Sequence, residues 1–459
     1  MNRPNNRARI QPARRLAYEV IRAVHESDAY ANLLLPSKLA AARLSEADAG
    51  LATELTYGTL RRQGYYDRVL AIVTGRPLDK LDPEVLDVLR LGAHQLLGMR
   101  VAAHAAVDES VALVAASGKR SATGFVNGVL RTLTRSTPEQ WREKAVAGLS
   151  GERLLAAELA HPLWIVQAFA AALDAEGRGD ELDELLIADN TAPRVSLVAL
   201  PGLSTPDQLG EPGHVSPIAA RSVGGDPAAN PVVASGWARV QDEGSQLAAL
   251  ALSRARPVRA GERWLDLCAG PGGKAAVLAA EAAAGGAELL ANEVMPARAQ
   301  LVRNALAVFD PAPEVLVNDG RDVGESGEMF DRILLDAPCT GLGALRRRPE
   351  ARWRKQPSDL AELSVLQGEL LDAAASVLAP GGILAYVTCS PHLAETREAV
   401  AGVLARHPEL IALDTPSVLA GIATHDLGLG SGTHAQLWPH RHGTDAMFIQ
   451  LLSRSEGGP

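Results

Sequence analysis

The chain has 459 residues, a formal net charge of −9, 47% hydrophobic residues and 22% charged residues. At about 150 residues per domain, this length allows two or three domains, and the composition excludes a disordered, collagen-like or coiled-coil protein. No uncharged apolar run approaches the roughly 20 residues of a membrane span, and the arginine-rich start lacks the apolar stretch of a signal peptide. We therefore expect a cytoplasmic protein without membrane contact, and we expect it to be a monomer.

The cysteine content excludes a disulfide framework. The chain has three cysteines, Cys268, Cys339 and Cys389, and none of them forms the Cys-x-x-Cys spacing of a zinc site. The cluster at 440–442, His-Arg-His, lacks further ligands for a metal. We predict no metal, and any cysteine that matters does so as a thiol.

Hydrophobic spacing predicts an all-α domain at the N-terminus. Apolar residues recur at helical intervals over 13–135, interrupted by glycine and proline. One stripe is formed by Leu86, Leu89, Ala93 and Leu97. Residues 194–200 are a strand candidate, whereas the proline-, glycine- and serine-rich stretch 201–236 predicts loops or a connector.

After residue 236 the pattern changes to alternating strands and helices. Short apolar runs of this kind, bounded by turn residues, predict strands that are buried on both faces. The alternation predicts an α/β domain with a parallel, doubly wound, Rossmann-like sheet, whose ligands bind at the carboxyl ends of the strands. The strand candidates are 263–268, 288–294, 314–318, 331–336 and 383–388.

The first of these strands ends in the glycine-rich turn 268–274, which leads into a helix. A P-loop would need glycine at Cys268 and serine or threonine at Ala275, and a dinucleotide fingerprint would need a third glycine. The next strands end in Glu293, suited to ribose hydroxyls, and in Asp319, placed to contact an adenine amino group. This arrangement favours an S-adenosylmethionine pocket; the alternative is a tight turn with two solvated acids.

Two cysteines follow neighbouring strands of the predicted sheet. Cys339 comes after the strand that ends in Asp336, and Cys389 after the next. A lone buried cysteine is usually a small hydrophobic residue, but two at one sheet edge suggest chemistry. A thiolate beside a methyl donor suits methylation of a pyrimidine at C5, because that carbon becomes nucleophilic only after a thiol adds to C6.

These motifs resemble the Sun-type family of RNA cytosine-5 methyltransferases. The family's hallmarks are Asp-x-Cys-Ala-x-Pro-Gly-Gly-Lys, Asp-Ala-Pro-Cys-x-Gly and Thr-Cys-Ser, and the resemblance extends to 240–246, Pro349, Trp353 and 444–448. The helical domain is similar to the antitermination factor NusB. That similarity rests on the segments 54–61, 89–97, 103–109 and 124–131. Together the two resemblances imply methylation of a cytosine in 16S ribosomal RNA.

The resemblance also implies roles for individual residues. Cys389 would be the nucleophile at C6, Cys339 would assist breakdown of the covalent adduct, and Asp336 would lie between the cofactor and the base. Since DNA cytosine methyltransferases use a Pro-Cys as nucleophile, the reverse assignment stays open. The residues implied to bind RNA phosphates are Arg346, Arg347 and Arg348. The residues implied to bind the cofactor are Cys268, Ala269, Gly270, Pro271, Gly272, Gly273, Lys274, Glu293, Asp319 and Asp336.

We expect a basic tail at 1–10, a NusB-like RNA-binding domain at 11–140, a connecting region at 141–235 and a catalytic domain at 236–456. The chain departs from the family at Gly270, where alanine is common, at Ala275, where threonine is common, and at 395–398, where Glu-Thr-Arg-Glu replaces Glu-Asn-Glu. Two alternatives are another nucleic acid as substrate, either transfer RNA or DNA, and a non-catalytic RNA-binding or adaptor protein. The intact cysteines argue against the second.

Overall fold

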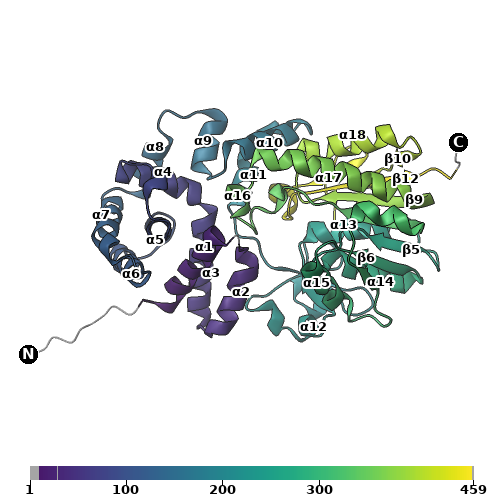
Figure 1. The fold of residues 1–459 in the computed structure, drawn as a ribbon, viewed down its shortest axis with the longest axis horizontal. Helices are drawn as coiled ribbons and strands as arrows, with labels where there is room; N and C mark the ends of the chain where they lie inside the picture. The colour runs from purple at the N-terminus through teal and green to yellow at the C-terminus, as the bar shows by residue number, and fades with distance from the viewer. Residues whose placement is uncertain (1–9, 28, 457–459) are drawn as a thin grey trace, which may run out of the picture. The chain divides into compact units, whose positions relative to one another are not determined.

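The computed structural model describes residues 10–27 and 29–456, so all but the last residue of the expected basic tail lies outside the described residues. The chain forms two compact units (Figure 1). The first unit consists of the chain up to Gln167 together with Leu182–Thr191 and Leu345–Arg354. The second consists of Ala168–Glu181, Ala192–Ala344 and the chain from Lys355 onwards.

The first unit is helical, as the sequence predicts. Local signals explain where its helices begin: Ser45 accepts a hydrogen bond from the Asp48 N–H at the start of α3, and Thr137 and Gln140 form a capping box at α8. Its helices are α1 (Pro12–Glu26), α2 (Ala31–Ala42), α3 (Glu46–Arg61), α4 (Gln63–Thr74), α5 (Pro83–Leu97), α6 (Ala103–Ala116), α7 (Thr123–Leu133), α8 (Pro138–Val146), α9 (Gly151–Glu158), α11 (Leu182–Asp189) and α16 (Ala351–Arg354). The α10 helix (Leu163–Asp174) runs from the first unit into the second.

The predicted apolar stripe lies on α5. Leu89 and Ala93 are fully buried, and Leu86 and Leu97 pack against the same core. The stripe therefore marks the face that α5 turns to the other helices of the first unit.

The second unit contains an eight-stranded sheet in the order β10-β12-β9-β8-β5-β6-β7, with β11 paired to β12. Its strands are β5 (Arg263–Asp266), β6 (Glu288–Asn292), β7 (Glu314–Leu316), β8 (Phe330–Asp336), β9 (Leu378–Thr388), β10 (Leu410–Ala412), β11 (His434–Leu437) and β12 (Met447–Arg454). Strands β5 to β9 are parallel and correspond to the five strand candidates of the sequence. The order reverses between β5 and β8, and ligands of such sheets bind at this point.

The predicted doubly wound α/β fold is confirmed, but its sheet is not parallel at one edge. The β12 strand runs antiparallel to β9, β10 and β11, which makes the sheet mixed. β10 and β11 have three and four residues. Segments this short carry too little periodicity to be distinguished from loops. An antiparallel strand also needs no crossover helix, so the alternation of strands and helices does not indicate where it lies.

Helices cover both faces of this sheet, as a doubly wound fold requires. In Figure 1, α17 (Pro357–Ser376) and α18 (Arg397–Arg406) lie along one face, and α13 (Glu243–Ser253), α14 (Gly273–Gly285) and α15 (Pro296–Leu306) lie along the other. Each face has its own hydrophobic cluster, one around Val277 and Leu334 and the other around Leu335 and Leu371. The remaining helices of this unit are α12 (Pro231–Ala234), α19 (Thr415–Ala420) and α20 (Pro439–His442).

A second, smaller sheet precedes the large one. It has four antiparallel strands in the order β2-β3-β1-β4: β1 (Ser196–Ala199), β2 (Glu211–Pro212), β3 (Ala219–Arg221) and β4 (Ala238–Val240). The β1 strand matches the candidate at 194–200, but the stretch 201–236, expected to be loops, also contributes β2 and β3. These strands have two and three residues, and proline and glycine surround them, so the composition conceals them.

Candidate active site at the carboxyl edge of the sheet

The glycine turn lies where the strand order reverses, between the end of β5 and the start of α14. Gly272 has a φ of 102°, and a Cβ built on it would lie 2.7 Å from Ala305 Cβ and 3.0 Å from Val302 Cα. Only glycine combines this backbone conformation with this close packing. The turn thus presents the N-terminal N–H groups of α14 at the sheet edge, where they favour a negatively charged ligand group.

Glu293 lies directly against this turn. Its carboxylate is buried and accepts hydrogen bonds from the Gly270 N–H at 3.1 Å and the Met295 N–H at 3.0 Å. A Cβ at position 270 would lie 2.1 Å from Glu293 Oε2, which accounts for glycine where the family often has alanine. The structure therefore brings together the turn and the acid that the sequence places on separate strands.

Asp319 is engaged within its own loop. It accepts hydrogen bonds from the Arg321 N–H at 3.0 Å and from the Arg321 guanidinium at 2.6 Å, and these bonds lower the pKa of Asp319 to about 2. With Asn292 and Asn318 it lines part of a cavity of about 400 Å³ under the 3-10 turn η6 (Gly320–Ser326). None of the cysteines lines this cavity, so it is separate from the thiol chemistry described below.

Three ionisable residues lie at the ends of β5 and β8 and at the start of α14: Asp266, Asp336 and Lys274. Lys274 Nζ lies 2.8 Å from Asp336 Oδ2. Burial by itself would lower the pKa of Lys274, but Asp336, together with Cys389, outweighs it and raises that pKa. Asp266 is fully buried at the end of β5, and its carboxylate has no hydrogen bond to another described side chain. Burial and the charge of Asp336 raise the pKa of Asp266 to about 8.

The two predicted catalytic thiols are adjacent. Cys339 Sγ and Cys389 Sγ are 3.5 Å apart, each on the loop after its strand. The hydrogen bond to Cys389, followed by burial and by the charge of Cys389, raises the pKa of Cys339 well above its usual value. The two thiols are therefore coupled, and loss of a proton by one opposes loss of a proton by the other.

Cys268 differs from this pair. Burial, followed by the charges of Asp266 and Asp336, raises the pKa of Cys268. A thiol that stays protonated is a poor nucleophile. Its place in the glycine turn agrees with a role in shaping the cofactor site.

Loops from four separate segments meet around the thiols. The Gly343 N–H donates to the Cys389 carbonyl at 2.9 Å, and the Ala446 N–H donates to the Gly343 carbonyl at 2.9 Å. The Asp445 N–H donates to Asp242 Oδ1 at 3.1 Å. A Cβ at position 343 would lie 1.9 Å from the Ala446 carbonyl oxygen, so only glycine allows this approach. These contacts join the segments around Asp242, Gly343, Cys389 and Asp445, which are far apart in the sequence.

Two polar groups of this site lie in segments that the sequence analysis quotes, 240–246 and 395–398, but the sequence assigned no role to either residue. Gln241 Oε1 is buried beside Gly273 and has no hydrogen-bond partner among the described residues. Such an acceptor is a candidate contact for a bound ligand. Glu395 is fully buried and accepts hydrogen bonds from Thr340. Its signal in the sequence is the run 395–398, where only the departure from the family pattern was apparent.

The predicted RNA-binding arginines differ in exposure. The segment Leu345–Arg354 belongs to the helical unit, although the segments before and after it belong to the other unit. Within it Arg346 is buried, Arg347 is half-buried and Arg348 is exposed. The Arg348 guanidinium lies 5.6 Å from the centroid of the Tyr30 ring. Arg348 is therefore the best placed of the three for phosphate contact.

Arg352, in the same basic run, is a structural residue. It is fully buried, and its guanidinium donates to the carbonyls of Arg61, Ala160 and Asp189 and to Asn190 Oδ1 at 2.9 to 3.3 Å. We expect Arg352→Met to lower the free energy of unfolding by about 3 to 5 kcal/mol, because it leaves several buried acceptors without donors. Urea unfolding measures this loss. Arg348→Met is the matched control, and an equal loss in both variants would contradict the assignment.

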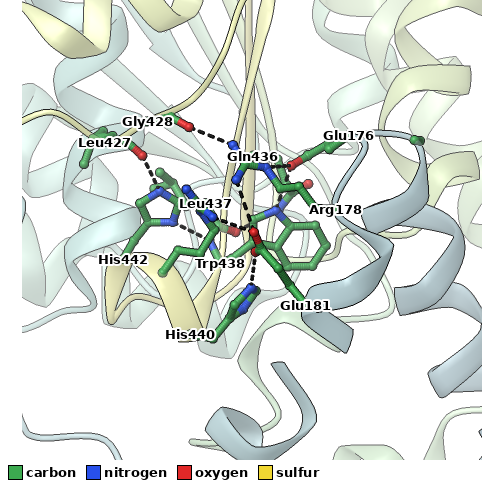
Figure 2. Close-up of polar contacts among 12 residues, drawn as sticks. Glu176, Arg178, Glu181, Leu427, Gly428, Gln436, Leu437, Trp438, His440 and His442 are labelled. Atoms are coloured by element: carbon green, nitrogen blue, oxygen red, sulfur yellow. Dashed lines mark hydrogen bonds and ion pairs between the residues drawn. The ribbon is translucent and has the colours of Figure 1, made fainter. Parts of the chain in front are cut away.

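The histidine cluster near the C-terminus has a structural role in the second unit (Figure 2). His440 Nε2 and Arg441 contact the Glu181 carboxylate at 2.8 and 2.7 Å, and Trp438 Nε1 donates to Glu176 at 3.0 Å. These contacts attach the segment Ala168–Glu181 to Trp438 and to the short helix α20, which follow β11. Within the part of the chain that the structure describes, no group of three or more potential metal ligands occurs.

The helices of the described residues also bear on membrane insertion. No single helix there is long and apolar enough to cross a bilayer, and one sharply bent pair, α9 with α10, meets the criteria of length and composition together.

Comparisons with known proteins identify the family. The family model described as 16S rRNA methyltransferase RsmB/F matches residues 255–453, and the NusB family model matches residues 11–135. The ribosomal RNA small subunit methyltransferase B of Pseudomonas putida is 35% identical over 457 residues, with 97% of this chain and 98% of that protein covered. The chain belongs to the ribosomal RNA small subunit methyltransferase B family.

Membership of this family confirms the resemblance and the NusB-like domain predicted from the motifs. Rv1407 of Mycobacterium tuberculosis (strain H37Rv), named provisionally as a methyltransferase, is 48% identical over 460 residues, with 99% of both chains covered. Among solved structures, PH0851 shares the fold with a TM-score of 0.80 at 22% identity, covering 97% of this chain and 99% of that one. Members of the RsmB/F family are methyltransferases that use S-adenosylmethionine as cofactor.

Proposed function

We propose that this protein transfers a methyl group from S-adenosylmethionine to C5 of a cytosine in 16S ribosomal RNA, through a covalent bond between Cys389 and C6. The observation that carries the proposal is the pair of thiols 3.5 Å apart at the carboxyl edge of the sheet. A single nucleophile needs one thiol, whereas addition followed by release needs two groups with different protonation.

The residues around the glycine turn fit the cofactor. The start of α14 suits the carboxylate of the cofactor, and Glu293 suits its ribose hydroxyls. Gln241 Oε1 and both carboxylate oxygens of Asp266 are buried without a hydrogen-bond partner among the described side chains, so they are available to a ligand. When bound, S-adenosylmethionine supplies an electrophilic methyl group on a positively charged sulfur. Asp319 remains the proposed contact for the adenine amino group.

Cys389 starts the reaction as the thiolate. Its sulfur bonds to C6 of cytosine, and the electron pair of the C5=C6 bond moves to C5, which takes the methyl group. Lys274 is close enough to Cys389 for their charges to interact, and this favours the thiolate. Asp336, paired with Lys274, holds that cation in place.

Cys339 completes the reaction. Once Cys389 is bonded to carbon, its negative charge is gone, and with it two of the causes that raise the pKa of Cys339. Cys339 can then lose its proton to solvent and accept the proton from C5. The electrons of the C5–H bond restore C5=C6, which expels Cys389 as a thiolate and leaves Cys339 protonated as at the start.

The proposed substrate is RNA, which the relatives' names as ribosomal RNA methyltransferases support. Mapping of 5-methylcytosine by bisulfite sequencing, in RNA from cells with and without this protein, tests the proposal. We expect one position in 16S RNA to lose its signal when the protein is absent. Loss confined to transfer RNA or DNA would identify another substrate, and unchanged methylation would favour a non-catalytic RNA-binding protein.

Arg348 is the proposed phosphate contact. We expect Arg348→Ala to weaken RNA binding and to lower the log–log slope of affinity against salt by about 0.7 to 0.9, the value for one lost phosphate contact. Fluorescence anisotropy with labelled RNA between low and physiological salt measures the slope. Lys80→Ala, at an exposed lysine beside Asp79, is the control with unchanged slope; an unchanged slope for Arg348→Ala would mean a solvated loop.

A further inference from the structure

A buried carboxylate joins the two thiol-bearing loops. Glu395, at the end of the 3-10 turn η8 (Leu393–Glu395), has no exposed surface. Its Oε1 accepts the Thr340 N–H at 2.7 Å, and its Oε2 accepts the Thr340 hydroxyl at 2.5 Å. Thr340 directly follows Cys339, so Glu395 restrains the loop of one thiol through both the backbone and a side chain.

The same network reaches the loop of the other thiol. The hydroxyls of Thr340 and Ser390 are 3.1 Å apart, and Ser390 directly follows Cys389. Since the only hydroxyl proton of Thr340 is donated to Glu395, Ser390 is the donor in this contact. Gln367 adds a third restraint, because its Nε2 donates to both Glu395 Oε1 at 3.2 Å and the Pro338 carbonyl at 2.8 Å.

We propose that Glu395 is the positioning residue of the two thiols: through Thr340 and Ser390 it holds Cys339 and Cys389 at the separation that adduct release requires. This chain of hydrogen bonds from Glu395 through Thr340 to Ser390 needs a carboxylate, because both oxygens of Glu395 accept from Thr340 and neither donates. It also needs burial, since water would otherwise compete for Thr340 and Ser390. The inference rests on the proposed function for its catalytic meaning, but the geometry can be tested separately.

The geometric test uses phenylarsine oxide, which condenses with two neighbouring thiols to form two As–S bonds and releases its oxygen as water. One reagent should bind per wild-type chain, and Cys389→Ser should abolish this binding. We expect Glu395→Gln and Thr340→Val each to weaken binding at least tenfold. Thr340→Val keeps the charge of Glu395 and the shape of the side chain, so it separates position from charge. Glu398→Gln, at an exposed glutamate one residue beyond Arg397, is the control with wild-type affinity.

The catalytic test is a single turnover with RNA and S-adenosylmethionine. We expect Glu395→Gln and Thr340→Val to form the covalent adduct but to release it at least tenfold more slowly, with unchanged cofactor affinity, and Thr340→Ser to restore release. Wild-type affinity for phenylarsine oxide in both Glu395→Gln and Thr340→Val would overturn the proposal. If Glu395→Gln does not fold, Thr340→Val decides. If the wild-type protein does not methylate cytosine, the proposed function fails, and the reagent still reports on Glu395.

Discussion

Cys389→Ala is expected to abolish both methylation and the covalent RNA adduct, while S-adenosylmethionine still binds. The reason is the order of events: attack on C6 precedes methyl transfer, so loss of the nucleophile stops the cycle before any bond to RNA forms. Incubation with labelled RNA and cofactor, followed by a denaturing gel, measures the adduct directly. Calorimetry with the cofactor alone shows that the variant is folded.

Cys339→Ala is the matched variant, and its expected result is the opposite. The methylated RNA should remain attached to Cys389, because the group that takes the C5 proton is missing. Because the two sulfurs are 3.5 Å apart, both substitutions remove a thiol from the same place in the site. An adduct trapped by Cys389→Ala and none with Cys339→Ala would reverse the roles, as in the DNA enzymes; methylation unchanged in both variants would refute a covalent mechanism.

Asp266→Asn is expected to raise the stability of the cofactor-free protein at pH 8. In the folded protein the pKa of Asp266 is raised to about 8 by burial and by Asp336, whereas in an unfolded chain it is about 3.9. Between these values the folded state binds more protons. The stability therefore falls as pH rises, by at most about 1.4 kcal/mol per pH unit.

Thermal unfolding of wild type and Asp266→Asn from pH 5 to pH 9 measures this dependence. We expect the difference in stability between the two proteins to grow in favour of the variant up to about pH 8 and then to level off, since asparagine has no proton to lose. Parallel curves would show that Asp266 is ionised throughout. The neighbouring residues Asp336, Lys274 and Glu293 are present in both proteins, so the comparison changes only the side chain at position 266.

The same substitution should weaken cofactor binding. A positively charged sulfonium bound beside Asp266 would favour the charged carboxylate, so binding would expel the proton from Asp266 and would strengthen as pH rises. The wild-type affinity relative to that of Asp266→Asn should increase by up to tenfold per pH unit below pH 8. S-adenosylhomocysteine, whose sulfur is neutral, is the control ligand and should show a smaller increase.

Much of the fold is determined locally and could be predicted. The stripe on α5 and the five parallel strands follow from residue spacing, because a buried face must repeat with the period of its element. The mixed edge formed by β10, β11 and β12 could not be predicted. Pairing of these strands depends on long-range contacts such as Phe448 with Thr388, which a short segment does not announce.

Local sequence also predicted which residues are the candidate site residues. Cys339, Cys389 and Glu293 each follow a strand that the pattern identifies, and parallel strands end at one edge. Their contacts were decided only by the tertiary structure: the 3.5 Å between the thiols, and the burial of Asp266, depend on loops from distant parts of the chain. Ionisation is set by burial and by neighbouring charge, neither of which is a property of a residue alone.

The basic run shows the same limit most clearly. In the sequence, Arg346, Arg348 and Arg352 are all cationic residues of one basic segment. The fold exposes Arg348 and buries the other two, and it surrounds the guanidinium of Arg352 with backbone carbonyls. Composition determined that a cationic segment follows Cys339. Only packing, which desolvates some side chains and leaves others in water, decided which arginines are buried within the fold and which stay exposed.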